Sequence, residues 1–196
     1  MQRLDHAIRC LPMHGSSFFG IITKYKGIDL LLQAFIRLSE KNSNLYLVIA
    51  GRVSDEYTEE FGQLMNQYDH HPQIVKILKH IPKEEVPLLF EAADVVLLPY
   101  LEASQSGVLF MSYANGKPVI APNLGGFPND VVEGKTGLLF EPGDAESLYS
   151  ALVKFNNQYE SDFKNSKESI ITFSRENYSW EQSGKKLIEI YNHLIG

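Results

Sequence analysis

Apolar residues fall into two kinds of segment along this chain. Short, continuous apolar runs, such as residues 45–50 and 95–98, have the length and composition of buried strands. Longer segments between them repeat apolar residues every three or four positions, as Leu31, Phe35 and Leu38 do, which is the period of an amphipathic helix. The pattern therefore predicts strands and helices in alternation.

Continuous apolar strands separated by helices indicate a parallel sheet that is covered by helices on both of its faces. We therefore predict an α/β fold with a Rossmann-like parallel sheet. The expected strands are 18–22, 45–50, 74–78, 95–98, 118–121 and 136–140, and the expected helices are 28–40, 56–68, 83–93, 106–115, 128–132, 145–156, 161–173 and 181–194.

One domain accounts for most of the chain. Residues 1–16 form a poorly defined N-terminal segment, and residues 17–196 form the domain. The polar stretch 156–167 is the candidate linker, and we interpret it as part of a helical hairpin. Ligands of open parallel sheets bind at the carboxyl ends of the strands. The candidate walls of a site are therefore the loops 20–27, 51–55, 99–106 and 122–127.

Composition narrows the function classes. The chain has 196 residues, 44% of them hydrophobic, which is enough for one core. The formal charge of −6 argues against a broad basic face, so we expect no nucleic-acid partner. Cys10 is the single cysteine, which excludes an intrachain disulfide. No apolar run approaches the roughly 20 residues of a membrane span, and residues 1–6 lack the apolar core of a signal peptide. We expect a cytoplasmic protein.

The segment 103–121 is the most informative part of the sequence. It is a polar loop, then a helix, then a buried strand, and Ser104, Gln105, Ser106 and Gly107 stand where the helix begins. The first amides of a helix lack intrahelical partners, and the helix dipole favours negative charge there. The sequence therefore predicts a phosphate site at 104–107, although Ser106 is equally well interpreted as an ordinary N-cap.

Other motifs do not carry a function. The glycine spacing of residues 15–20 matches a P-loop, but Ile21 and Ile22 stand where Lys and Ser/Thr are needed, and we interpret the segment as a strand. No G-x-G-x-x-G follows the first strand, which argues against a dinucleotide dehydrogenase. His70 and His71 are adjacent, so they point apart, and we expect a solvated turn.

The chain resembles the C-terminal half of a retaining GT-B glycosyltransferase of the group 1, or family 4, type. The matching pieces occur in the same order and cover roughly nine tenths of the chain: FGIITKYKG (19–27), VIAG (48–51), IPKEEV (81–86), ADVVLLPY (93–100), SQSG (104–107), GKPVIA (116–121), GG (125–126) and GKTGLL (134–139). The resemblance implies a single GT-B half that binds a nucleotide-sugar donor.

The resemblance also implies roles for particular residues. Lys26 matches a lysine that contacts the donor diphosphate, and a cation there would stabilise the charge on the leaving group. Ser104, Gln105, Ser106 and Gly107 match the loop that cradles the phosphate. The glycines of this pattern, which would let the backbone approach the donor, are Gly20, Gly125 and Gly126. Arg52 and residues 79–82 are weaker candidates for the base and ribose, and for Arg52 we favour a solvated side chain.

Three positions depart from the family pattern. Many members carry two glutamates eight positions apart, and Ala103 and Met111 occupy those positions here. Glu102, one residue early, is the candidate substitute for the first glutamate and would contact the sugar hydroxyls. Ile21 stands where members often have an arginine that pairs with phosphate. Loss of one charged hydrogen bond typically costs on the order of 1.5–3 kcal/mol, so these departures leave the affinity for the donor undetermined.

The resemblance implies a partner that this sequence lacks. Complete members have an N-terminal GT-B domain that supplies the acceptor site, and any membrane contact would come through that domain. The chain is a fragment, one half of a split enzyme or a relic. Its last helix, 181–194, either exposes an apolar stripe toward the missing domain or packs on this same sheet.

We expect a glycosyltransferase donor domain that uses a UDP- or GDP-sugar with retention, with no cofactor and no bound metal. Alone it should bind donor and transfer no sugar. The alternatives are a non-catalytic nucleotide-sugar-binding or interaction module and, less favoured, a GT-B nucleotide-sugar epimerase.

Overall fold

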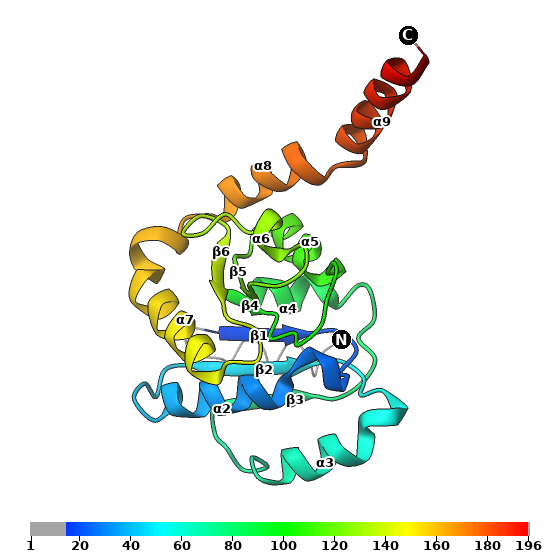
Figure 1. The fold of residues 1–196 in the computed structure, drawn as a ribbon. Helices are drawn as coiled ribbons and strands as arrows, with labels where there is room; N and C mark the ends of the chain where they lie inside the picture. Colours follow the sequence, from blue (N-terminus) through cyan, green and yellow to red (C-terminus); the bar gives the residue numbers. More distant parts are fainter. Residues whose placement is uncertain (1–14, 196) are drawn as a thin grey trace.

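A computed structural model of the protein describes residues 15–195 (Figure 1). Six parallel strands form one sheet in the order β3-β2-β1-β4-β5-β6. They are β1 (Gly15–Phe19), β2 (Tyr46–Ala50), β3 (Ile74–Ile77), β4 (Val95–Leu97), β5 (Val119–Pro122) and β6 (Gly137–Phe140). The chain builds one half of the sheet outward from β1, then returns to the other side of β1 with β4. In sheets of this kind the crevice between two such strands is the usual ligand site.

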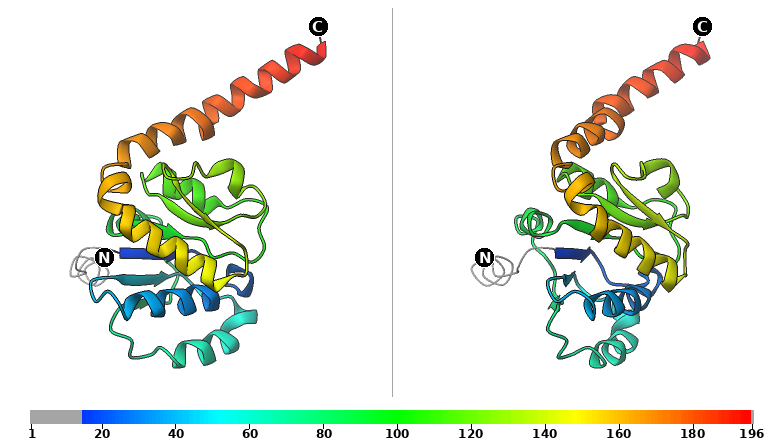
Figure 2. Two further views of the ribbon diagram at one scale, coloured as in Figure 1. Left: turned by 60° about the vertical axis from the view of Figure 1, so that its left-hand side comes forward. Right: turned by 90° about the vertical axis from the view of Figure 1, so that its left-hand side faces the viewer.

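Helices cover both faces of the sheet. The helices are α2 (Ile28–Ser39), α3 (Thr58–Asn66), α4 (Val86–Ala92), α5 (Gly107–Ala114), α6 (Phe127–Asp130), α7 (Ala145–Gln158), α8 (Lys167–Tyr178) and α9 (Trp180–Ile195). Buried residues of α2, α3 and α7 belong to one core cluster, and those of α5 and α8 to another, to which α4 adds Phe90; Leu89 of α4 belongs to a third, smaller cluster. The last helices, α8 and α9, lead away from the sheet, as the two views of Figure 2 show.

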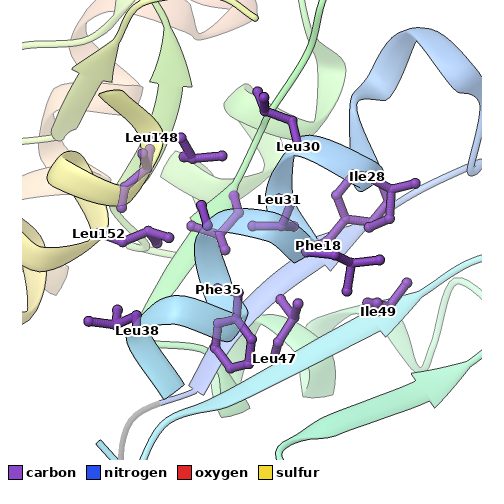
Figure 3. Close-up of a cluster of buried hydrophobic side chains, with 14 of the residues drawn as sticks. Phe18, Ile28, Leu30, Leu31, Phe35, Leu38, Leu47, Ile49, Leu148 and Leu152 are labelled. Carbon is purple, nitrogen blue, oxygen red and sulfur yellow. The ribbon is translucent and has the colours of Figure 1, made fainter. Parts of the chain in front are cut away.

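The larger core cluster fixes the position of α2 against the sheet. Phe35 and Leu31 of α2 are 1% and 0% exposed, and they face Phe18 of β1, Leu47 of β2 and Leu152 of α7 (Figure 3). Full burial of a large apolar side chain stabilises a fold by about 1.5–3 kcal/mol. The start of α2, directly after the loop that follows β1, is therefore held firmly.

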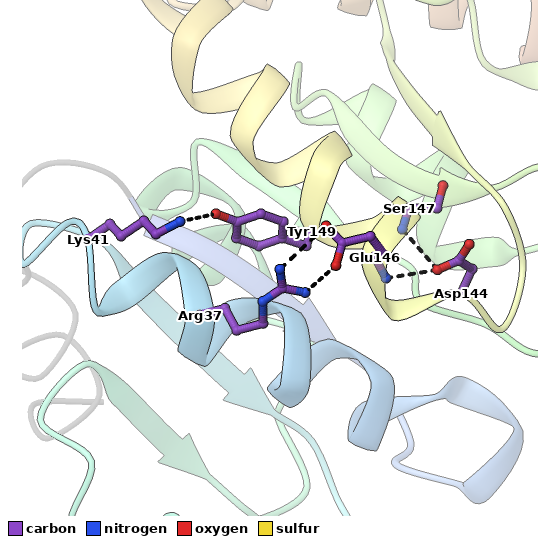
Figure 4. A network of polar contacts seen from close by, with 6 residues as sticks. All are labelled: Arg37, Lys41, Asp144, Glu146, Ser147 and Tyr149. Carbon is purple, nitrogen blue, oxygen red and sulfur yellow. Dashed lines mark hydrogen bonds and ion pairs between the residues drawn. The ribbon is translucent and has the colours of Figure 1, made fainter.

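Polar contacts on the surface join the same two helices. Arg37 of α2 forms an ion pair with Glu146 of α7, and Lys41 donates a hydrogen bond to the Tyr149 hydroxyl (Figure 4). The Asp144 carboxylate caps α7 by accepting hydrogen bonds from the amides of residues 146 and 147 at 2.8 and 3.1 Å. Both partners of the ion pair are about half exposed or more, so packing rather than charge holds α2 to α7.

The first strand differs from the sequence-based expectation. It spans 15–19 rather than 18–22, so the boundary predicted after residue 16 falls inside β1, and residues 1–14 lie outside the described part of the chain. Ser17 is only 3% exposed although serine is usually read as a surface residue. Gly20, at φ +117°, ends the strand, and Ile22 keeps only an isolated bridge to Val53.

Two helical segments also differ. The helix expected at 83–93 begins at Val86, because Pro87 rather than Pro82 stands in its first turn. The segment expected to be helical from 161 to 173 contains a π-helix, η3 (Tyr159–Phe163), followed by α8. The π-helix extends α7 and buries Phe163, so the expected helical hairpin is replaced by a continuation of α7 and a turn.

Candidate functional site

A cleft lies between the loops that follow β1 and β4. Its volume is about 430 Å³, and its lining residues are Tyr25, Lys26, Tyr100, Ala103, Ser104, Gln105, Ser106, Gly107, Val108 and Met111. Five of the residues singled out from the sequence, Lys26 and 104–107, therefore come together here. The cleft stands at the carboxyl ends of the strands, as the parallel sheet predicts.

Lys26 enters the cleft from the short 3-10 helix η1 (Lys24–Lys26). Gly27, which follows it, adopts a left-handed φ of +62°, and a Cβ there would lie 2.1 Å from the Pro99 carbonyl oxygen. Only glycine permits this approach of the two loops. Gly20 borders the ammonium as well, since a Cβ on it would lie 2.9 Å from the Lys26 Nζ. Two glycines thus give the lysine its position.

The Lys26 side chain is buried and has no acidic partner among the described residues. The residue is 7% exposed, and no carboxylate of the described residues 15–195 lies within ion-pair distance of its Nζ. Its nearest aromatic neighbour is Tyr100, whose ring centroid is 5.4 Å from the Nζ. Desolvation lowers the pKa of Lys26 below its ordinary value of 10.5. An anion in the cleft would favour the charged form.

The N-terminus of α5 forms the opposite wall. The Ser106 side chain caps the helix by accepting a hydrogen bond from the Leu109 amide at 3.4 Å. The first amides of such a helix point into the loop, and its dipole adds partial positive charge. The cap that the sequence suggested for Ser106 is thus present. It uses the Leu109 amide and leaves the two amides before it, at residues 107 and 108, available to a ligand.

Backbone contacts hold the loop 103–106 in place. The Gly126 amide donates a hydrogen bond to the Ser104 carbonyl at 3.0 Å, and a Cβ on Gly125 would lie 2.0 Å from the Ala103 carbonyl oxygen. The close approach at these glycines is therefore to the neighbouring loop. A contact of Gly125 or Gly126 with a donor stays a prediction.

Tyr100 is the most buried of the three lining residues that sequence reasoning missed, the others being Tyr25 and Val108. It is 3% exposed, and burial raises the pKa of its hydroxyl to about 12, an effect partly offset by a hydrogen bond with Ser106. Its ring meets those of Tyr25 and Phe127 edge to face, with centroids 6.2 and 5.9 Å apart. The available signal was its place directly after Pro99 at the end of a strand.

Several other candidates lie outside the lining of this cleft. Glu102 is exposed and is not one of the lining residues, so its proposed contact with sugar hydroxyls stays a prediction. Ile21 is 53% exposed on the loop after β1. Arg52 pairs with Asp55, and both side chains are at least half exposed, in agreement with a solvated arginine. By contrast, the two residues near α5 that depart from the family pattern, Ala103 and Met111, do line the cleft.

The described residues lack two other functional features, a metal site and a membrane span. Within the described range, no group of three or more His, Cys, Asp or Glu side chains is arranged to hold a metal ion. No helix between residues 15 and 195 has both the length and the apolar character needed to span a membrane.

The chain is similar to known proteins in sequence and in fold. Residues 16–158 match the family model described as Glycosyl transferases group 1. The chain is 31% identical over 189 residues to a D-inositol 3-phosphate glycosyltransferase of Corynebacterium urealyticum, an alignment that covers 90% of this chain and 42% of the relative. The chain thus spans less than half the length of this curated relative.

Solved structures share the fold. The structure of Anabaena Alr3699/HepE in complex with UDP matches with a TM-score of 0.80 at 16% identity, over 98% of this chain and 51% of that one. The C-terminal domain of a Francisella tularensis glycosyl transferase group 1 family protein, LpcC, matches with a TM-score of 0.72 at 21% identity, over 88% and 91% of the two chains. The six-stranded sheet is therefore a Rossmann-like GT-B half, and this chain belongs to the group 1 glycosyl transferases.

Proposed function

We propose that the cleft binds the diphosphate of a nucleotide sugar and that the chain is the donor-binding half of a retaining glycosyltransferase. The observation that carries this proposal is Lys26, which is 7% exposed, lines the cleft and pairs with no carboxylate among residues 15–195. Burial of an unpaired charge is costly, so such a group is kept where a ligand completes it. The complex of Alr3699/HepE with UDP is in keeping with a nucleoside diphosphate as that ligand.

The proposed chemistry needs positive charge at the leaving group. Lys26 and the first amides of α5, at residues 106–107, would stabilise the charge that develops on the departing UDP or GDP. Ser104 and Gln105 would complete the phosphate cradle, and a diphosphate oxygen would take the proton of the acceptor. Because the protein supplies these positive groups itself, we propose a reaction without a bound metal or other cofactor. Glu102 would contact the sugar hydroxyls.

We further propose that an N-terminal GT-B half supplies the acceptor site. The Corynebacterium urealyticum relative is more than twice as long as its matched part, since that part is 42% of its length. Apolar side chains on α9 are exposed, among them Leu187 at 55% and Leu194 at 76%. An exposed apolar stripe of this kind marks a contact surface. The chain alone would bind donor, and transfer would require the second half.

One observation favours a second function, a non-catalytic nucleotide-sugar-binding module. Met111 lines the cleft at a position where the family pattern has a glutamate, and a thioether cannot replace a carboxylate as an acceptor for ribose hydroxyls. Transfer of a sugar after the upstream half is supplied would exclude this alternative.

Lys26→Ala tests the proposal, with Lys24→Ala as a matched control. Lys24 lies on the same 3-10 helix, but its side chain is 71% exposed and pairs with Glu60. Saturation with UDP or GDP at a hundred times its Kd should stabilise the wild type by about 2.7 kcal/mol in thermal unfolding. By calorimetry, Lys26→Ala should lose about 1.5–3 kcal/mol of diphosphate affinity and little affinity for uridine or guanosine. Lys24→Ala should retain both.

Two outcomes would contradict the proposal. One is the absence of any thermal shift with millimolar UDP, GDP or their sugars. The other is an equal loss of diphosphate and nucleoside affinity in Lys26→Ala, because Lys26 would then support the loop rather than the phosphate.

A further inference from the structure

The surroundings of Lys26 are unusual for a buried cation. Buried lysines generally pair with a carboxylate, since desolvation of the charge must be offset. Here the neighbour is the Tyr100 ring, with the Nζ 5.4 Å from its centroid. A cation over the face of an aromatic ring is attracted by the ring quadrupole, and the attraction strengthens when the pair is desolvated. The ring thus holds the ammonium without neutralising it.

That distinction matters for ligand binding. A carboxylate in the same place would compete with an incoming phosphate and would repel it. A neutral ring leaves the full charge of Lys26 available to the ligand. The ring is also held firmly, because Tyr100 is 3% exposed and packs edge to face against Phe127 and Tyr25.

We propose that Tyr100 is a positioning residue, which holds the Lys26 ammonium charged and aimed into the cleft so that the site prefers ligands with phosphate. This inference rests on the proposed function. It assigns to the ring a role that neither Lys26 nor the amides of α5 perform. The hydroxyl has a separate contact, with Ser106. The preference for phosphate should therefore follow the ring rather than the hydroxyl.

Two substitutions separate the ring from the hydroxyl. Tyr100→Leu removes the ring, and Tyr100→Phe keeps it. Calorimetry with UDP and with uridine, or with GDP and guanosine, gives the ratio of diphosphate to nucleoside affinity in each variant. We expect Tyr100→Leu to lower this ratio roughly three- to thirtyfold, the range of one cation–π contact, and Tyr100→Phe to stay within about threefold of the wild type.

Phe61→Leu is the control for loss of a buried ring. Phe61, on α3, is also 3% exposed, and it is not one of the residues that line the cleft. Phe61→Leu should lower the stability of the protein without changing the ratio of diphosphate to nucleoside affinity. An unchanged ratio in Tyr100→Leu would overturn the inference, and so would an equal fall in Phe61→Leu.

A measurement on the wild type keeps the test independent of the folding of Tyr100→Leu. Protons near the face of an aromatic ring are shifted upfield, so the Lys26 Hε resonances should lie upfield in the free protein. They should remain there after UDP or GDP is added. Resonances at ordinary lysine positions would overturn the role of Tyr100 while leaving diphosphate binding intact. Failure of the wild type to bind any nucleoside diphosphate would instead refute the proposed function, and this inference with it.

Discussion

Two helices of this protein have the same kind of sequence pattern and opposite surroundings. Helix α2 repeats apolar residues every three or four positions, and its Leu31 and Phe35 are 0% and 1% exposed. Helix α9 has a similar spacing at Leu187, Tyr191 and Leu194, yet these are 55%, 56% and 76% exposed. The main contacts of α2 are with α7, whereas those of α9 are with the neighbouring α8.

An amphipathic pattern therefore describes only part of the surroundings of a helix. The pattern indicates that a helix has an apolar partner, because packing of that face supplies most of its stability. It does not indicate where the partner is. For α2 the partners are α7 and the sheet, whereas the apolar side chains of α9 stay exposed among the described residues 15–195. Of the two alternatives for the last helix, packing on this sheet is therefore wrong, and the exposed stripe is confirmed.

The largest effect should come from the buried helix. Phe35→Ala deletes a ring that packs against β1, β2 and α7 in the larger core cluster. We expect the free energy of unfolding to fall by about 3–5 kcal/mol, the usual cost of such a deletion. Urea titration followed by circular dichroism measures it. A loss below about 1 kcal/mol would mean that the two helices differ less than their exposure indicates.

The exposed helix should respond differently. The double variant Leu187→Ser, Tyr191→Ser should change the stability of this chain by less than about 0.5 kcal/mol, as is usual for surface positions. If an upstream GT-B half is supplied in trans, the same variant should weaken its association with this chain. Analytical ultracentrifugation of the mixture measures that association.

A control within α9 makes that prediction sharper. Glu189 and His193 have the same spacing and are also exposed, but they are polar. Glu189→Ser, His193→Ser should therefore leave the association unchanged. If both double variants weakened the association equally, the apolar stripe would not be the contact surface.

The smallest effect concerns Lys26, a buried charged residue that directly precedes Gly27 and α2. Its folded-state pKa is lowered, so between that pKa and 10.5 the unfolded chain binds more protons than the folded one. Stability of the wild type relative to Lys26→Met should therefore rise with pH across that interval. Urea midpoints of both proteins from pH 8 to 10.5 measure the difference. A difference that falls with rising pH would mean that Lys26 has an anionic partner in the folded protein.

Much of the fold could be predicted because the strands are local apolar runs. The predicted strands 95–98 and 118–121 agree with β4 and β5 within about one residue. The order of the strands could not be predicted, since it depends on pairing between segments far apart in the chain. The π-helix was missed for a different, local reason: its hydrogen bonds join residues five apart rather than four, which the period of an α-helix does not reveal.

The site was only partly visible in the sequence. The resemblance singled out Lys26 and residues 104–107, and the structure places them in one cleft. Burial of Lys26 and its contact with Tyr100 could not be predicted, because both depend on the approach of two loops that are about 75 residues apart. Glu102 was singled out through its spacing from an aligned position, and spacing alone does not determine which way a loop residue faces.

The loops around the cleft are joined to one another through their main chains. The Leu101 amide donates to the Tyr25 carbonyl at 2.8 Å, the Gly20 amide to the Ala50 carbonyl at 3.1 Å, and Gly126 to Ser104 at 3.0 Å. These bonds form when the chain folds, so the loss of loop entropy belongs to folding rather than to binding. A ligand that enters should order little of the backbone. Its association should then be limited by diffusion and orientation, and its affinity should be set by how fast it leaves.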